Sequence, residues 1–196
     1  MKKNLAEVKR ISSFLAYEKD IELILRKIFV ESRPYSDDLK RLLVINTKDC
    51  LDAKDNEKYN KKIKEMTLSK LVEEGYIRLE PKIYLKEHEE VKSYILISFD
   101  NFTRNAKNPE FRDCTVNFDI ISYTDYWDIG DYRIRPLKIA GYIDGILNEA
   151  KLSGIGTFNF MGCNALLLSQ ELSGYSLSYR AIHGSDDRIK EEEDNG

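Results

Sequence analysis

Hydrophobic residues recur at helical spacing near the start of the chain. Between Tyr17 and Phe29, isoleucines and a leucine stand three and four positions apart, with charged residues between them. This spacing places the apolar residues on one face of a helix, which can then pack against a core. Arg33-Pro34 follows, and we expect the first helix to end before this pair. The apolar positions are Ile21, Ile24, Leu25 and Ile28.

A second, shorter helix is predicted after this proline. Ser36 is a suitable N-cap, and the two aspartates that follow it suit the positive end of a helix dipole. Leu39, Leu42 and Leu43 would form the buried side of this helix.

Residues 46–62 are too polar to form a core, and they predict a loop that runs into a third helix. That helix would continue through Ile63, Met66 and Leu71. It should end at Gly75, because glycine readily adopts the left-handed conformation that closes a helix.

Beyond Gly75 the apolar pattern changes to a period of two, which is typical of strands. YIRLEPKIYL, residues 76–85, predicts a strand at an edge or with a kink, because its Pro81 cannot donate to a central ladder. SYILISFD, residues 93–100, predicts a second strand, and CTVNFDII, residues 114–121, alternates more cleanly. The inward side of the third strand would be Cys114, Val116, Phe118 and Ile120.

RIRPLKIAGYIDGILN, residues 133–148, restores helical spacing and has Pro136 in the first turn. Gly141 and Gly145 lie four positions apart in this helix, where glycine is disfavoured. We attribute the two glycines to close approach of a sheet or a neighbouring helix. The inward side of the helix would be Leu137, Ala140, Ile143 and Leu147.

Two further strands are predicted in residues 154–184, joined by a turn near Ser173-Gly174. The fold class is therefore α+β, a mostly antiparallel sheet of about five strands with one long helix packed across it, plus an N-terminal helical region. We assign residues 1–74 to that helical region and residues 75–184 to the α+β domain. Residues 185–196 form a charged tail that we expect to be disordered.

The composition argues against several functional classes, namely strongly basic DNA-binding proteins, membrane-spanning proteins and secreted proteins. The 196 residues include 31 Lys plus Arg and 34 Asp plus Glu, a net charge of −3, so no overall basic field points to DNA or an anionic membrane. No apolar run approaches the roughly 20 residues that cross a bilayer, and the N-terminus does not resemble a signal peptide. We expect a water-soluble protein without a membrane partner. Its three widely spaced cysteines favour a reducing cytosol.

Residues for catalysis or metal binding are sparse. His88 and His183 are the two histidines, and the spacing of zinc ligands is absent. Cys114 and His183 could form a thiolate pair, but the phase of Cys114 in its strand favours a core residue. Gly154 and Gly156 are spaced like the start of a dinucleotide fingerprint, yet they precede a strand and lack the third glycine, which favours a turn. We expect no metal, no cofactor and no enzymatic activity.

The order of helix, glycine and hairpin in residues 68–85 is also that of a winged-helix domain. A DNA-binding regulator with an appended α+β domain is therefore an alternative. Its recognition helix would carry Glu73 and Glu74 with Lys70, which is a poor surface for phosphates. An ordinary connection from helix to strand explains the same pattern.

A polar insert, Asn101–Arg112, connects two of the predicted strands, and Asn108-Pro109 would shape its return. Aromatic residues and arginines, which are enriched in interface cores, gather in this insert and in the linker after the next strand. The aromatic residues could equally pack on their own domain, and the arginines could form a solvated rim. We interpret the insert as an arm that contacts another subunit. The candidate interface residues are Phe102, Arg104, Phe111, Arg112, Tyr126, Trp127, Arg133 and Arg135, with Tyr123 beside them.

From about Ile77 to Asp187 the chain resembles the tail terminator or head–tail joining proteins of tailed bacteriophages. The resemblance is carried by the hairpin YILISFDNF with NPEFRDCTVNFDII, the helix RIRPLKIAGYIDGILN and the strands that end LSGYSLSYRAIHGSDD. It implies a structural virion protein of the phage neck, made in the cytoplasm of the bacterial host. It also implies a homo-oligomer, a hexameric ring that joins tail tube and head-connector proteins, with DNA only as passing cargo. The long N-terminal region departs from the compact members of this family and could serve adaptor or head-completion contacts.

Overall fold

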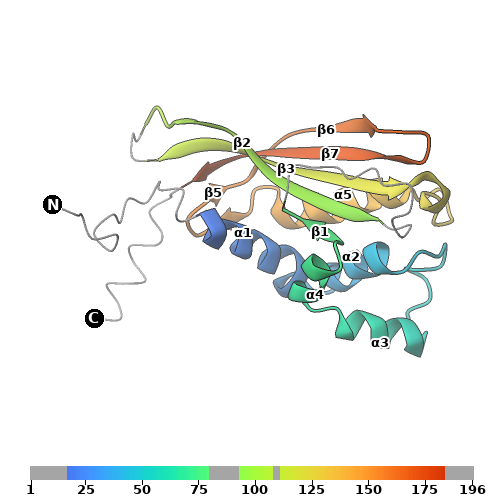
Figure 1. Cartoon of the computed structure of the whole chain (residues 1–196). Helices are drawn as coiled ribbons and strands as arrows, with labels where there is room; N and C mark the ends of the chain where they lie inside the picture. The colour runs from blue at the N-terminus through green and yellow to red at the C-terminus, as the bar shows by residue number, and fades with distance from the viewer. Residues whose placement is uncertain (1–16, 80–92, 108–110, 184–196) are drawn as a thin grey trace, which may run out of the picture.

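A computed structural model describes residues 17–79, 93–107 and 111–183. In these ranges a five-stranded sheet forms one layer, and the helices form a layer against one of its faces (Figure 1). This confirms the α+β prediction, with α5 (Arg135–Leu147) packed across the sheet. The other helices are α1 (Tyr17–Arg26) with a π-helical continuation (Lys27–Glu31), α2 (Tyr35–Val44), α3 (Glu57–Glu65), α4 (Leu68–Glu73) and a 3-10 turn (Thr124–Tyr126).

The strands of the sheet lie in the order β1-β2-β3-β7-β6. All neighbouring pairs are antiparallel except β1, which runs parallel to β2. β1 is an edge strand, as predicted for its segment, although Pro81 lies outside the described residues. β6 is the other edge. The strands are β1 (Ile77–Arg78), β2 (Tyr94–Arg104), β3 (Arg112–Tyr123), β6 (Asn159–Leu167) and β7 (Leu172–His183), and a small separate hairpin contains β4 (Lys151–Leu152) and β5 (Gly156–Thr157).

The predicted alternation along β3 is confirmed. Cys114, Val116, Phe118 and Ile120 are all buried, and each belongs to the main hydrophobic cluster. Burial of each large apolar side chain contributes roughly 1.5–3 kcal/mol, so β3 anchors the core from the centre of the sheet.

The helical region and the sheet share that core. Ile24 of α1, Leu42 of α2 and Ile143 of α5 belong to the same cluster as Phe118 of β3. The two segments that the sequence separates at residue 74 therefore pack on one another.

The predicted first helix is confirmed, since α1 and its continuation end before Arg33-Pro34. The prediction that Ser36 caps α2 is wrong. α2 already begins at Tyr35, and the Ser36 hydroxyl donates instead to the Ile28 carbonyl at 2.7 Å. That bond joins the first turn of α2 to the preceding helical segment.

The third predicted helix is divided into α3 and α4. Thr67 interrupts it, because its side chain accepts a hydrogen bond from the Lys70 backbone N–H (3.3 Å) and so caps a new helix. Gly75 has a φ of 72° and closes α4, as predicted.

The insert between β2 and β3 is shorter than predicted. β2 continues to Arg104 and β3 begins at Arg112, so only residues 105–111 connect them. A register shift between Asp100 and Thr103 lets the strand continue through polar residues. Asn108-Pro109 lies outside the described residues.

The predicted turn at Ser173-Gly174 is wrong. The connection between β6 and β7 is residues 168–171, and Gly174 lies inside β7. A Cβ on Gly174 would stand 1.8 Å from the carbonyl oxygen of Ile120, so glycine is required here by a close approach of two strands. Gly154 and Gly156 have φ of 82° and 76° in the small hairpin, which confirms the turn predicted there.

The inward face of α5 is confirmed at Ala140, Ile143 and Leu147, which are buried. Leu137 is 40% exposed, and its predicted burial is wrong. A Cβ on Gly141 or Gly145 would meet nothing within 4 Å, so the close approach predicted at these glycines is absent among the described residues.

Candidate subunit interface

Four of the predicted interface residues lie at the end of the β2–β3 hairpin. Phe102 is half-buried, and its ring stacks on Phe99 with centroids 6.4 Å apart and meets the His183 ring edge-on at 6.0 Å. Phe102 therefore packs on its own subunit. Arg104 and Arg112 face each other across the ladder, and Phe111 is half-buried beside them.

Tyr126 and Trp127 follow β3, and both are half-buried. The Trp127 indole N–H donates to the Ser122 carbonyl at 3.3 Å, and its ring lies 6.1 Å from that of Tyr175. Both residues thus have contacts within the subunit and an exposed remainder.

Arg133 connects the linker before α5 to the loop after α2. Its Nη1 donates to Asp52 Oδ1 at 3.0 Å, and this hydrogen bond lowers the pKa of the Asp52 carboxyl. A second carboxylate, that of Asp131, lies 3.3 Å from Arg133 Nη2. The guanidinium is therefore engaged inside the subunit.

Arg135 is fully buried, which corrects its assignment to an exposed interface. It lies in the first turn of α5 and joins that helix to the chain that leaves α2. The sequence could not indicate this role, because most of the acceptors lie about ninety positions away. Its guanidinium donates to four backbone oxygens, those of Tyr126 (2.7 Å), Leu42 (2.6 Å), Ile45 (3.0 Å) and Thr47 (2.8 Å).

The edge strand β6 contains none of the interface residues predicted from the sequence, yet it is an exposed surface. None of its nine residues is buried, and its sequence, NFMGCNALL, contains no charged residue and no proline. Phe160, Met161 and Leu167 are 49%, 59% and 86% exposed. Natural edge strands are usually short, charged or covered, so within residues 17–79, 93–107 and 111–183 β6 is an unprotected edge. Its lack of charge was visible in the sequence, but an apolar run is normally interpreted as a buried strand.

α5 extends the open surface beside β6. Asp144 of α5 accepts a hydrogen bond from the Tyr179 hydroxyl at 2.7 Å, and burial together with the Asp144 carboxylate raises the pKa of the Cys163 thiol on β6. Asp144 is thus close to the inner side of β6. Gly141 and Gly145, on the same helix, leave backbone there without a covering side chain.

A protein-family model described as YomW matches residues 36–181, which is more than half of the chain. The chain belongs to the YomW family. The family name is of Bacillus phage origin, and the protein is phage-associated. Searches of curated proteins and of solved structures gave no match.

The match to the YomW family extends from α2 to β7. It crosses residue 74, so helices α2, α3 and α4 belong to the same family unit as the sheet. This agrees with the hydrophobic core that they share with it.

Cys114 and His183 of the YomW-family chain both lie inside the fold. Burial, followed by the charge of Asp20, raises the pKa of the Cys114 thiol to about 12, so the thiol is protonated at neutral pH. Its Sγ lies 3.7 Å from the Ala181 carbonyl, and His183 is paired instead with Asp20 in a fully buried contact. The interpretation of Cys114 as a core residue is therefore confirmed.

Residues 17–79, 93–107 and 111–183 contain no group of three or more His, Cys, Asp or Glu that could hold a metal ion. His88 lies outside these ranges. Within them, no helix has the length and apolar character needed to cross a membrane.

The segment predicted as a possible winged helix leads into the central sheet. α4 has six residues, and β1 after it pairs in parallel with β2 at Ile77↔Ile95 and Arg78↔Leu96. The rest of the predicted hairpin, with Lys82, lies outside the described residues.

The sheet face opposite the helices is polar along its centre. Ser178 donates to Asn117 (2.7 Å), Ser176 to Asp119 (2.5 Å), and Asn117 to Asp100 (2.7 Å). These hydrogen bonds link β2, β3 and β7 side by side, so the YomW-family protein presents a polar and partly acidic surface there.

Proposed function

We propose that this protein is a structural component of the phage neck, and specifically a tail terminator whose subunits form a hexameric ring between tail tube and head-connector proteins. The observation that carries the proposal is the β6 edge, an uncharged nine-residue strand on which Phe160, Met161 and Leu167 are exposed. Such an edge invites pairing with another strand. A non-enzymatic role in the virion, after synthesis in the bacterial cytoplasm, belongs to the same proposal.

A ring requires two different surfaces on each subunit that fit one another. β6 supplies one of them. At the opposite edge β1 pairs only with Ile95 and Leu96, so within the described ranges no strand covers the outer side of β2 from residue 97 to 104. Pairing of β6 with this part of β2 in the next copy would continue the sheet from subunit to subunit.

The hairpin end fits this geometry. Phe102 and Arg104 lie in the uncovered part of β2, so the predicted arm would stand at the same junction between subunits. In this position Arg104, which is exposed, would lie at the contact with the neighbouring subunit.

The polar sheet face suits the lumen of such a ring. Asp100, Asp113 and Asp119 lie on it with Arg180, so it does not concentrate positive charge. Neutralisation of many phosphates would hold DNA in place, whereas a polar and acidic lumen lets the duplex pass.

The test is electron microscopy of phage particles from cells that produce either the wild-type protein or the Met161→Lys/Leu167→Lys double variant. We expect the wild-type protein at the junction of head and tail, and separate heads and tails with the variant. Val30→Lys, another exposed apolar position, is the matched control and should assemble normally. Particles that lack the wild-type protein would refute the proposal. Salt-dependent DNA binding that is lost on changing Lys70, Arg78 and Lys82 to Ala would favour the winged-helix regulator.

A further inference from the structure

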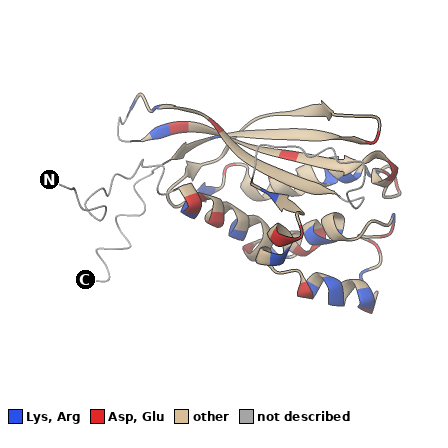
Figure 2. Cartoon of the chain, viewed as in Figure 1, with Lys and Arg blue, Asp and Glu red and all other residues tan. Residues whose placement is uncertain are grey.

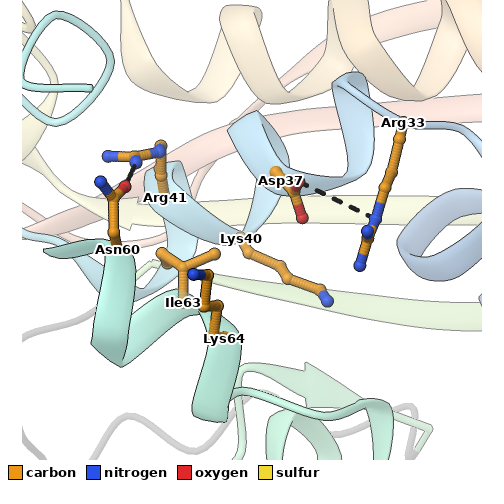
Figure 3. A pocket seen from close by; sticks show the side chains of 7 residues that line it. All are labelled: Arg33, Asp37, Lys40, Arg41, Asn60, Ile63 and Lys64. Carbon is orange, nitrogen blue, oxygen red and sulfur yellow. Dashed lines mark hydrogen bonds and ion pairs between the residues drawn. The ribbon is translucent and has the colours of Figure 1, made fainter. Parts of the chain in front are cut away.

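A pocket of about 330 Å³ lies between α2 and α3, on the helical side of the molecule away from β6 (Figures 1 and 3). Four cationic side chains line it, Arg33, Lys40, Arg41 and Lys64, together with one acid, Asp37. The whole chain has a net charge of −3, so this concentration of positive charge is local. Figure 2 shows basic residues along α3 as well.

The single acid does not neutralise the pocket. Asp37 Oδ2 lies 3.9 Å from Arg33 Nε, where the Arg33 side chain is largely exposed and the Asp37 side chain is about half-exposed. Among the described residues, no carboxylate oxygen lies within 4.0 Å of a side-chain nitrogen of Lys40, Arg41 or Lys64. Three basic side chains from two helices therefore line the same pocket without a carboxylate partner in the described ranges.

Arg41 is the most informative of the three. It is 6% exposed, its Nη2 donates to Asn60 Oδ1, and Asn60 is itself held by a 2.8 Å hydrogen bond to the Lys54 carbonyl. The guanidinium is thus fixed at the wall of the pocket. Its Nη1 is buried and has no hydrogen-bond acceptor in the described part of the chain. An unsatisfied donor of this kind costs roughly 1–3 kcal/mol, which an acceptor in the pocket would recover.

Lys40 is also buried, at 9% exposed. Burial lowers the pKa of its ammonium group, with Arg33 adding to the effect and Asp37 opposing it. A bound anion would stabilise the charged form of Lys40 and relieve the repulsion between the cations.

We propose that this pocket binds the phosphate group of a small phosphorylated ligand. A phosphate offers oxygens in several directions, which matches donors that line the pocket from two helices, and Arg with Lys is the usual pair for phosphate recognition. The volume is at the lower end of small-molecule sites and exceeds what a bare phosphate fills. This inference does not depend on ring assembly.

The experiment is calorimetric titration of the full chain at low salt with inorganic phosphate, pyrophosphate, ADP and citrate. We expect saturable binding of pyrophosphate or ADP at one site per chain, stronger than that of phosphate and citrate. If ADP binds more tightly than pyrophosphate, the natural ligand is a nucleotide; if pyrophosphate binds more tightly, it is a free diphosphate. Either result supports the site. Citrate binding as tight as pyrophosphate binding would overturn the assignment to phosphate, and no saturable binding would overturn the site.

Two lysines of α3 provide a matched pair of variants. Lys64 lines the pocket, whereas Lys61 is exposed on the same helix and does not. Lys64→Gln should weaken pyrophosphate binding about tenfold while Lys61→Gln changes it less than twofold. Arg41→Gln should abolish binding, with circular dichroism to check its fold. Equal effects of the two lysine variants, or tighter binding of a duplex oligonucleotide than of pyrophosphate, would overturn the proposal.

Discussion

Arg135 and strand β6 differ in a way opposite to the usual rule, because the charged residue is buried and the uncharged strand is exposed. A charged guanidinium is fully buried by its own chain and satisfied by four carbonyls, while a nine-residue strand without charge remains at the surface. The first arrangement joins α5 to the chain after α2, and the second leaves a strand exposed among the described residues. Contact with a partner is therefore better inferred here from what the fold leaves uncovered than from residue types that are frequent at interfaces.

Replacement of Arg135 should have the largest effect on stability. Arg135→Met keeps most of the side-chain volume but leaves the four carbonyls without their donor, so we expect a loss of about 3–5 kcal/mol in the free energy of unfolding. Urea unfolding measures it. Arg133→Met, at an exposed ion pair, is the control and should change stability far less. Equal losses in the two variants would contradict the structural role of Arg135.

Alanine substitutions at two glycines, one in β7 and one in the edge strand β6, compare the interior of the sheet with its edge. Gly174→Ala places a Cβ 1.8 Å from a backbone oxygen and should destabilise the fold by about 3 kcal/mol. Gly162→Ala in β6 meets nothing closer than 3.7 Å and should stay within about 0.5 kcal/mol of the wild type. Thermal unfolding of the two variants tests this, and a Gly162→Ala protein as unstable as Gly174→Ala would show that β6 is packed.

Leu167→Lys should hardly affect the isolated subunit. The side chain is 86% exposed, so we expect a change in unfolding free energy within about 0.5 kcal/mol. The association of subunits should be lost, as measured by sedimentation. A folded variant that associates normally would remove β6 from the interface.

The hairpin end should contribute least to folding and moderately to assembly. Phe111→Ala with Arg112→Ala alters half-buried side chains beside the connection of β2 and β3, so the double variant should keep its circular dichroism spectrum. Ring assembly should be weakened. If the double variant assembles at the same protein concentration as the wild type, the prediction that this hairpin end is a subunit-contacting arm is refuted.

The sequence predicted the parts of the fold in which local pattern and final environment agree. β3 alternates because one side faces the core, and Gly75 closes α4 through its own backbone conformation. The prediction failed where the environment comes from distant residues. Gly174 was assigned to a turn because glycine serves both turns and close strand contacts, and only the position of the Ile120 carbonyl decides between them.

The candidate site shows the same division. The sequence located aromatic residues and arginines near one hairpin, but burial of Arg135 depends on carbonyls supplied by the chain after α2. The strand β6 was predicted, but its exposure was not, because the exposure results from the position of β6 at the edge of the sheet.

Native mass spectrometry of the purified full chain, compared with that of the Met161→Lys/Leu167→Lys variant, tests whether β6 joins the subunits. We expect a closed oligomer for the wild type, six subunits in the ring we propose, and a folded monomer for the double variant. A wild-type protein that stays monomeric at all concentrations, or a variant that forms the same oligomer, would contradict the assignment of β6 as the surface that joins the subunits.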